Sequence, residues 1–296
     1  MVRKIISVLS VLFAGFISLA GSVHAVEDKI IPTPVTEQIY MIAGEGGNIG
    51  LFIGGDGTFL IDDQFAPLTE KIVAAIKSVG GDYPKFLINT HYHGDHTGGN
   101  ENLGQGGTLI FSHDNVRERL STGSFIEAFN MKRAGVSREG LPVVTFSEDI
   151  SFHLNGDSVR AIHVPHAHTD GDSFIYFKGA NVIHSGDFFF NGFYPFIDVN
   201  HGGSLKGMII AVDKVLSLAD DSTKIIPGHG PLGDKEQLTS YRQMLWTAYE
   251  RLSKLKAEGK TAQEAVAAKP LADLESTWGD GMFKSDRWIE LIYSGV

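Results

Sequence analysis

Residues 85–96 read KFLINTHYHGDH and join a short apolar run directly to a cluster of polar side chains. The run KFLIN is typical of a strand that is buried on both faces. Immediately after it stand four possible metal ligands, His91, His93, Asp95 and His96. Side chains two residues apart at a strand end point the same way, so His91 and His93 can bind one ion together. After the turn at the intervening glycine, Asp95 and His96 can face a second ion. The stretch therefore predicts a strand that ends at two adjacent metal sites.

The composition of the chain limits the kinds of site that it can contain. It has 296 residues, 43% of them hydrophobic, which is enough for a large core in one or two domains. There is no cysteine, so a metal would be held by nitrogen and oxygen atoms and no thiolate nucleophile exists. The formal net charge is −10, which disfavours nucleic acid and anionic lipid as partners.

The first 25 residues have the features of a secretory signal peptide. Arg3 and Lys4 precede an apolar run, and Val23-His24-Ala25 ends in the small residue that signal peptidases need. An uncleaved membrane anchor is the alternative, but the run is short for a span of about 20 residues. We therefore predict cleavage after Ala25, a periplasmic or secreted protein, and no membrane attachment of the mature chain. The mature chain would have a formal charge of −12, because the leader holds two basic and no acidic residues.

Strand and helix patterns alternate in two halves of the chain, roughly 30–135 and 145–235, an order that helices and two sheets packed in layers would satisfy. Asp114 is the expected cap of a helix in the first half. After Asp234, apolar side chains recur at spacings of three and four, which predicts a long helix with one apolar face. Glycine-punctuated apolar runs predict strands, the clearest at 37–43, 48–54, 58–63 and 85–89.

Three later segments also place His or Asp at the end of a strand-like run, beside glycine or proline. They are HVPHAHTDGDS at 163–173, HSGDFFF at 184–190 and IIPGHGP at 225–231. With the first motif, and in this order, they make the chain similar to the metallo-β-lactamase superfamily of zinc hydrolases over about residues 35–235. The resemblance implies an α/β (α+β) fold, a four-layer αββα sandwich with the metals at one edge of the two sheets. We expect residues 26–234 to form this domain and residues 235–296 to pack on it as a C-terminal helical segment.

The resemblance also assigns metal ligands. It implies a first zinc held by His91, His93 and His168, a second held by Asp95, His96 and His229, and a bridge between them by Asp187. His168 matches the family's pattern better than His166, which would lie outside the ligand set or be structural. His163 and His184 lie on strand patterns and are expected in the core or behind the ligands. His201 follows an aromatic loop and is a weak candidate.

The chemistry implied by the resemblance is hydrolysis by a hydroxide that bridges two metal ions about 3.5–4 Å apart. It would attack the carbonyl of a small ester, thioester, lactone or β-lactam, and Asp95 would orient it and relay its proton. His and carboxylate ligands favour zinc, although iron or manganese would also accept them. Redox di-iron members carry Glu at the position of His93, which argues against a redox role.

Two alternatives remain from the sequence, a dedicated periplasmic class B β-lactamase and a metal-binding member without catalysis. True lactamases of the family have cysteine or serine near Asp187, whereas aspartate is typical of glyoxalase II and lactonases. The segment after Asp187 offers no obvious lysine for a substrate carboxylate, and Lys206 is the nearest. Export and the acidic charge disfavour glyoxalase II itself. Loss of catalysis usually removes ligands, and here all seven positions are filled.

Three segments have roles that the sequence leaves open. The aromatic run FFFNGFYPFID, residues 188–198, is either a core strand with a turn or an apolar wall beside the metals. The glycine-rich GEGGN, residues 44–48, is more typical of a hairpin turn than of a loop that closes over substrate. WGDGMF, residues 278–283, either packs on the domain or reaches the cleft.

Overall fold

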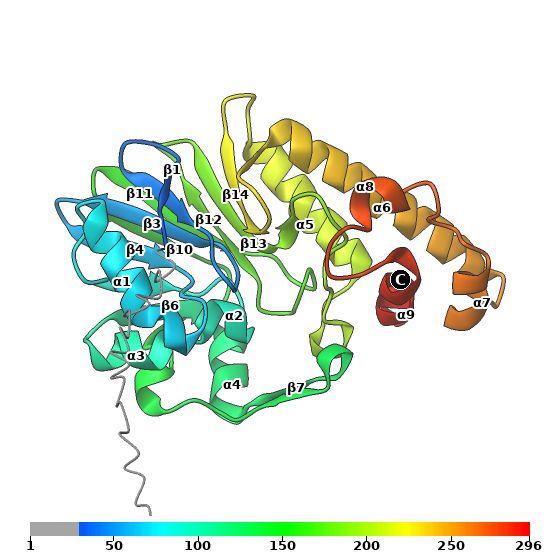
Figure 1. The fold of residues 1–296 in the computed structure, drawn as a ribbon, viewed down its shortest axis with the longest axis horizontal. Coiled ribbons are helices and arrows are strands. Elements are labelled where there is room, and N and C mark those ends of the chain that lie inside the picture. The colour runs from blue at the N-terminus through cyan, green and yellow to red at the C-terminus, as the bar shows by residue number, and fades with distance from the viewer. Residues whose placement is uncertain (1–29) are drawn as a thin grey trace, which may run out of the picture.

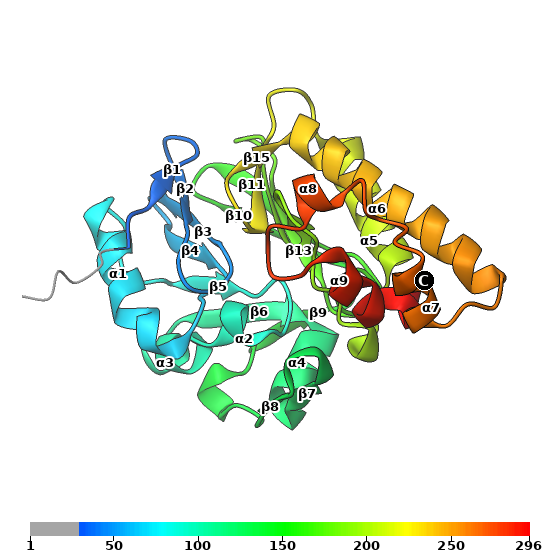
Figure 2. The ribbon, with the colours of Figure 1, turned by 45° about the vertical axis from the view of Figure 1, so that its right-hand side comes forward.

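The computed structural model describes residues 30–296, in which two β-sheets pack face to face and helices cover both outer faces (Figure 1 and Figure 2). The predicted signal peptide lies outside the described residues. The layers run helix, sheet, sheet, helix, and further helices follow at the C-terminal end. The expected four-layer αββα architecture with appended C-terminal helices is therefore confirmed. Within the described residues, no helix is both long and apolar enough to cross a bilayer.

The strands form two large sheets and one separate hairpin. The first sheet contains, in spatial order, β1 (Thr33–Pro34), β2 (Ile39–Ile42), β3 (Ile49–Gly54), β4 (Gly57–Ile61), β5 (Phe86–Ile88), β6 (Leu109–His113) and β9 (Val144–Phe146). The second contains β10 (Asp149–Leu154), β11 (Asp157–His163), β12 (Ser173–Phe177), β13 (Val182–Phe190), β14 (Lys224–His229) and β15 (Gly233–Asp234). The hairpin, which the sequence patterns did not predict, consists of β7 (Ser124–Ile126) and β8 (Met131–Arg133).

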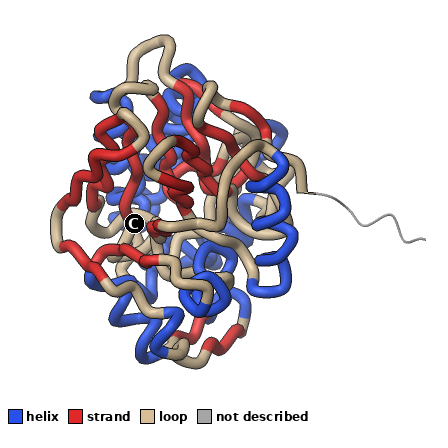
Figure 3. The backbone as a smooth tube through the Cα atoms, turned by 90° about the vertical axis from the view of Figure 1, so that its left-hand side faces the viewer, coloured by secondary structure: helices blue, strands red, loops and turns tan. Residues whose placement is uncertain are grey.

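The helices fall into three groups along the chain. The first half contains α1 (Thr69–Ser78), α2 (Gly94–Thr97), α3 (Asn100–Gln105) and α4 (Asp114–Thr122). The outer face of the second sheet is covered by α5 (Leu205–Leu218) and α6 (Lys235–Ala257). The chain ends with α7 (Ala262–Ala267), α8 (Glu275–Trp278) and α9 (Ser285–Ile292). Figure 3 shows these helices around the strands of both sheets.

Two helix starts illustrate how local chemistry sets the boundaries. Asp234 begins α6 with a capping box, because its side chain accepts the N–H of Gln237 while the Gln237 side chain accepts the N–H of Asp234. Asp114 is not the cap of α4, and that prediction was wrong. The preceding residue, His113, takes the position instead, and its Nδ1 accepts the N–H of Asn115 at 3.2 Å.

Phenylalanine side chains fill the space between the two sheets. Phe52 and Phe59 are cross-strand partners on β3 and β4 and point into this space. The Phe52 ring meets that of Phe177 on the second sheet edge-on, with the centroids 5.3 Å apart. The Phe59 ring lies 5.2 Å from that of Phe152. Burial of each such ring stabilises the fold by about 1.5–3 kcal/mol and fixes the two sheets relative to each other.

The strand directions bring the candidate ligands to one edge of the sandwich. The strands β4 and β5 are parallel, as are β13 and β14, so their carboxyl ends lie on the same side. His91 follows β5, His168 follows β11, and His229 is the last residue of β14. Asp187 lies in β13, close to its carboxyl end. Residues nearly 140 positions apart in the sequence are thereby placed together.

The C-terminal segment is held by Trp288 of α9 to the loop that follows β13. This side chain is fully buried, its ring stacks on that of Tyr194 at a centroid distance of 4.5 Å, and its Nε1–H donates to the carbonyl oxygen of Pro195 at 2.6 Å. We expect Trp288→Ala to lower the free energy of unfolding by about 3–5 kcal/mol, because it leaves a large cavity and an unpaired carbonyl. Denaturant unfolding measures this loss. The half-buried Trp246 provides the control, and equal losses in Trp246→Ala and Trp288→Ala would contradict the prediction.

Candidate metal centre

All seven predicted ligands meet at one edge of the sandwich of two sheets, in two adjacent groups. The first group contains His91, His93, His168 and Asp187, and the second contains Asp95, His96 and His229. Within each group, one ligand atom from every residue lies within 4.8 Å of the others. The Asp187 carboxylate lies between the groups: its Oδ2 is 3.5 Å from His168 Nε2 and 3.4 Å from His229 Nε2. This arrangement suits two neighbouring ions that share one carboxylate.

Each imidazole of the first group is oriented by a hydrogen bond from its outer nitrogen. His93 Nε2–H donates to Asp198 at 3.0 Å, and His168 Nδ1–H donates to the carbonyl oxygen of Phe196 at 2.8 Å. His91 Nδ1 is 3.0 Å from the Thr90 hydroxyl, whose own hydrogen goes to a carboxylate, so this nitrogen also donates. These partners assign the tautomer of every ring.

The three inner nitrogens consequently face one another as lone pairs. His93 Nδ1 lies 3.1 Å from His91 Nε2 and 2.8 Å from His168 Nε2, with no hydrogen assigned between them. Lone pairs at such distances repel, and a cation among them would turn the repulsion into coordination. Burial lowers the pKa of His91 well below its usual value and that of His168 to about 4, so both rings are neutral at pH 7, as metal binding requires.

In the second group, a carboxylate orients an imidazole in the same way. His96 Nδ1–H donates to Asp62 Oδ2 at 2.7 Å, and its Nε2 points at His229 Nε2, 3.4 Å away. Burial lowers the pKa of His229, but Asp187 and Asp95 outweigh this and raise it to about 9. The group therefore attracts positive charge strongly, which a divalent ion would supply in place of protons.

The two central carboxylates remain ionised. Burial raises the pKa of both Asp187 and Asp95, but the surrounding imidazoles outweigh it, and both pKa values lie below the usual range. Asp187 Oδ1 lies 3.0 Å from His96 Nε2 without hydrogen-bond geometry, and this buried oxygen has no hydrogen-bond partner in the described part of the chain. A buried carboxylate oxygen of this kind fits a metal ligand.

Residues 44–48 close the hairpin between β2 and β3, as predicted, and also support the second group. The backbone N–H of Gly47 donates to the carbonyl oxygen of Asp95, and that of Asn48 donates to Gly228. A Cβ on Gly47 would lie 2.0 Å from His96 Cε1, so a larger residue would displace this ligand. His184 also supports the segment, because its Nε2 bonds the carbonyl oxygen of Asn48 at 3.0 Å.

The aromatic run has both of the roles that its sequence allowed. Phe188 and Phe189 are fully buried in the core, whereas Phe190 and Phe196 line the cavity at the metal centre. The run is also a link between the C-terminal segment and a ligand. Trp288 holds the carbonyl oxygen of Pro195, and the next carbonyl oxygen, that of Phe196, orients His168.

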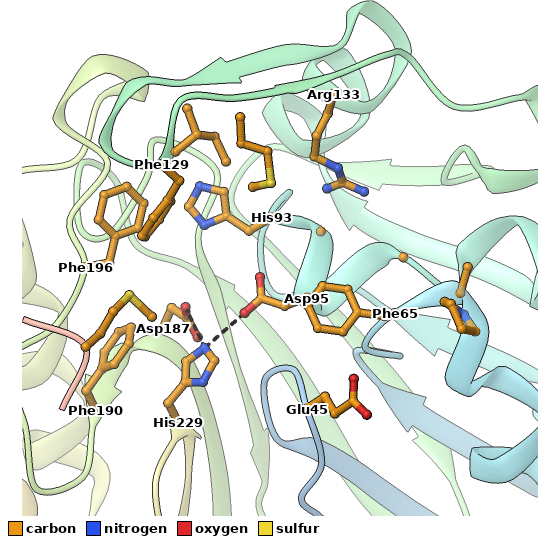
Figure 4. A pocket seen from close by; sticks show the side chains of 17 residues that line it. Glu45, Phe65, His93, Asp95, Phe129, Arg133, Asp187, Phe190, Phe196 and His229 are labelled. Atoms are coloured by element: carbon orange, nitrogen blue, oxygen red, sulfur yellow. Dashed lines mark ion pairs between the residues drawn. The ribbon is translucent and has the colours of Figure 1, made fainter.

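A cavity of about 640 Å³ opens beside the two ligand groups (Figure 4). His93, Asp95, Asp187 and His229 are among the residues that line it. Its other walls are largely apolar and include Phe65, Ile126, Phe129, Met131, Phe190, Phe196 and Met282. Segment 278–283 therefore reaches the cleft through Met282. The cavity joins the candidate metal centre to a site for a small, partly apolar molecule.

Three further residues of the site were not predicted from the sequence: Asp62 and Asp198, which orient ligands, and Arg133, which places positive charge in the cavity. Asp62 follows β4 as His91 follows β5, so its position after a strand was an available signal. Asp198 lies in an irregular segment and had none, although it also accepts a hydrogen bond from His201. Arg133, in the unpredicted hairpin, also lines the cavity.

The other histidines of residues 30–296 lie outside both ligand groups. The ring of the exposed His166 bonds the carbonyl oxygen of Gly202, and His163 stacks on His113 with the ring centroids 3.7 Å apart.

Comparisons with known proteins place the chain in one family. The family model described as the metallo-beta-lactamase superfamily matches residues 42–229. The chain is 27% identical to the beta-lactamase-like protein 2 homolog of Caenorhabditis elegans over 196 residues, 64% of this chain and 58% of that protein. It is also 27% identical to the probable hydroxyacylglutathione hydrolase glo2 of Schizosaccharomyces pombe over 200 residues, 64% of this chain and 67% of that protein.

Solved structures show the same fold. The metallo-beta-lactamase from Pontibacter korlensis matches with a TM-score of 0.57 and 19% identity, over 74% of this chain and 99% of that one. The sec-alkylsulfatase Pisa1 from Pseudomonas sp. matches with a TM-score of 0.66 and 16% identity, over 90% of this chain and 50% of that one. With its family match and its two groups of His and Asp side chains, the chain belongs to the metallo-β-lactamase superfamily.

Proposed function

We propose that this protein is an exported dinuclear zinc hydrolase that cleaves a small ester, thioester, lactone or β-lactam at its carbonyl group. The observation that carries the proposal is the convergence of inward-facing imidazole nitrogens and two ionised carboxylates at the wall of a cavity. Neutral imidazole and carboxylate are the ligands that zinc accepts in the absence of cysteine. When bound, a pair of such ions polarises a carbonyl group and makes water acidic enough to react at neutral pH.

The two carboxylates of the centre have different surroundings and therefore different tasks. Asp187 has a side chain that is 5% exposed, whereas the Asp95 side chain is 28% exposed and borders the cavity. Asp95 Oδ2 also lies 3.2 Å from His229 Nε2. Asp95 is thus placed to take the proton of the attacking water and to pass it to the leaving group. Asp187 is placed to hold the two ligand groups together.

The character of the site supports an ester or thioester more than a lactam as the main substrate. The name of the Schizosaccharomyces pombe relative refers to hydrolysis of a glutathione thioester. Aspartate at position 187 agrees with that class, whereas the lactamases of the family were expected to have cysteine or serine there. Export is supported by the N-terminal sequence, and N-terminal sequencing of the secreted protein tests cleavage after Ala25.

Removal of the metal is the direct test of this function. We expect the purified protein to contain about two zinc ions per chain and to lose turnover on treatment with a chelator, with recovery when zinc is restored. Metal analysis and a panel of a thioester, a lactone, an aryl ester and a chromogenic cephalosporin measure this. Two bound zinc ions with no turnover of any compound would instead favour a metal-binding protein without catalysis.

A further inference from the structure

Among the described residues that line the cavity, Arg133 is the one basic side chain outside the candidate metal ligands. It ends β8, and strand alternation places Met131 and Arg133 on the cavity side of the hairpin and Lys132 on the opposite side. Figure 4 shows the Arg133 guanidinium reaching toward the cavity on the side of Asp95, while Phe129 and Phe196 stand on the far side of His93. The cavity thus has a cationic side and an aromatic side.

The Arg133 guanidinium lies directly against the backbone of the metal-binding motif. A Cβ on Gly94 would be 2.6 Å from Arg133 Cζ and 2.7 Å from Nη1. Glycine at this position therefore leaves the space that the guanidinium occupies. Because Gly94 stands between His93 and Asp95, a group bound to Arg133 would be next to the two ligand groups.

Most of the hydrogen-bonding capacity of Arg133 is unused within the described residues. Its Nη1 donates to the carbonyl oxygen of Tyr92 at 3.3 Å, and no carboxylate of residues 30–296 lies within ion-pair distance of it. Partial burial lowers the pKa of Arg133 because it disfavours the cation, but a guanidinium stays charged at neutral pH. A half-buried cation with free N–H groups at a cavity is poised for an anion.

We propose that Arg133 binds a carboxylate of the substrate, so that the substrate is an acid whose apolar body lies against the aromatic side of the cavity. This inference rests on the proposed hydrolase function and narrows its substrate class. The planar fork of a guanidinium matches the two oxygens of a carboxylate. The cavity also contains the exposed carboxylate of Glu45, which would repel an anionic group bound beside it, so Arg133 is the place in the lining, apart from the candidate metal centre, that suits a carboxylate.

Arg133 offers the cationic partner for a substrate carboxylate that the segment after Asp187 lacks. A substrate carboxylate was expected to need a lysine there, and the structure instead offers an arginine from the separate hairpin of β7 and β8. The apolar side is formed in part by the same hairpin and its turn, through Ile126, Phe129 and Met131. One element, the β7–β8 hairpin, therefore contributes to both recognition features of the cavity.

The kinetic test compares two esters that share one scissile bond. 4-Nitrophenyl hydrogen adipate has a free carboxylate, and its methyl ester does not. We expect Arg133→Met to lower kcat/KM for the acid by about 10- to 100-fold and to change that for the methyl ester by less than about threefold. Lys132→Met removes the same charge from the opposite side of the same strand and is expected to change neither rate.

A binding test keeps the inference separate from the proposed activity. Calorimetry on the zinc-loaded protein compares benzylsuccinate, which has two carboxylates and an aromatic ring, with 4-phenylbutanoate, which has one carboxylate. We expect the wild type and Lys132→Met to bind benzylsuccinate at least tenfold more tightly, Arg133→Met to lose this preference, and Arg133→Lys to retain part of it. Absence of turnover with this pattern intact would reject the hydrolase function and still support the anion site.

Two results would overturn the assignment of Arg133. One is a preference for benzylsuccinate that persists in Arg133→Met. The other is that Arg133→Met and Arg133→Lys both lose affinity, and by the same factor for benzylsuccinate and for 4-phenylbutanoate. That result would show that the side chain only supports the backbone at Tyr92.

Discussion

Asp95→Asn is expected to lower kcat by about 10²- to 10⁴-fold in the zinc-loaded protein. The substitution keeps the size of the side chain but removes its charge and its ability to accept a proton. Asp95 borders the cavity, and the neighbouring imidazoles hold its pKa below the usual range, so it is an available base throughout the neutral range. Because asparagine is also a poorer ligand, we expect weaker binding of one zinc ion as a second effect.

The matched control for this variant is Glu45→Gln. Glu45 is an exposed carboxylate in the lining of the same cavity and belongs to neither ligand group, so its loss removes one negative charge without touching the centre. We expect its kcat to stay within about threefold of the wild type, since isolated exposed charges have small effects. Rates measured at saturating zinc separate the proton transfer from metal loss. Equal kcat values for Asp95→Asn and Glu45→Gln would show that Asp95 does not transfer the proton.

Six of the seven candidate ligands follow or end a strand and Asp187 lies within β13, so the strand patterns marked the segments that carry them. Parallel strands bring their carboxyl ends to one edge of a sheet, which agrees with His91, Asp187 and His229 lying together, but the full ligand set followed from the family resemblance. Spacing within the first motif then separated the two ions. Apolar runs and their punctuation repeat in both halves, which predicts helices and two sheets packed in layers, and the family resemblance implied the αββα order of those layers.

Arg133 and Asp198 were not predicted because they lie in segments without a clear pattern of polar and apolar residues. Hairpin β7–β8 has exposed and half-buried side chains except for the buried Ile126, and no clear alternation of polar and apolar residues, so its strands were not recognised. Arg133 is significant only because the hairpin folds over Gly94. Asp198 orients His93 from more than 100 positions away, and such pairing depends on the tertiary fold alone. The sequence therefore predicts the metal centre better than the walls of the cavity.

Asp187→Ala is expected to leave about one zinc ion per chain at stoichiometric metal and to lower kcat/KM by at least about 100-fold. Asp187 is the acidic residue whose oxygens approach ring nitrogens of both groups, with Oδ2 3.7 Å from His91 Nε2 and Oδ1 3.0 Å from His96 Nε2. Without it, two dipositive ions would lie side by side with no anionic protein ligand between them. Metal analysis after gel filtration, together with rates measured across a zinc titration, tests both parts of the prediction.

Asp63→Asn is the control that separates the role of Asp187 from the loss of any buried carboxylate. Asp63 is also buried and lies next to Asp62, but it belongs to neither ligand group. Burial raises the pKa of Asp63 well above its usual value, so burial disfavours the charge that the amide removes. We expect Asp63→Asn to keep two zinc ions and its rate, and Asp187→Cys, which restores an anionic ligand, to regain part of the metal lost in Asp187→Ala. Two ions and an unchanged rate in Asp187→Ala would mean that the two metal sites are held independently, so the carboxylate between them would not be a bridge.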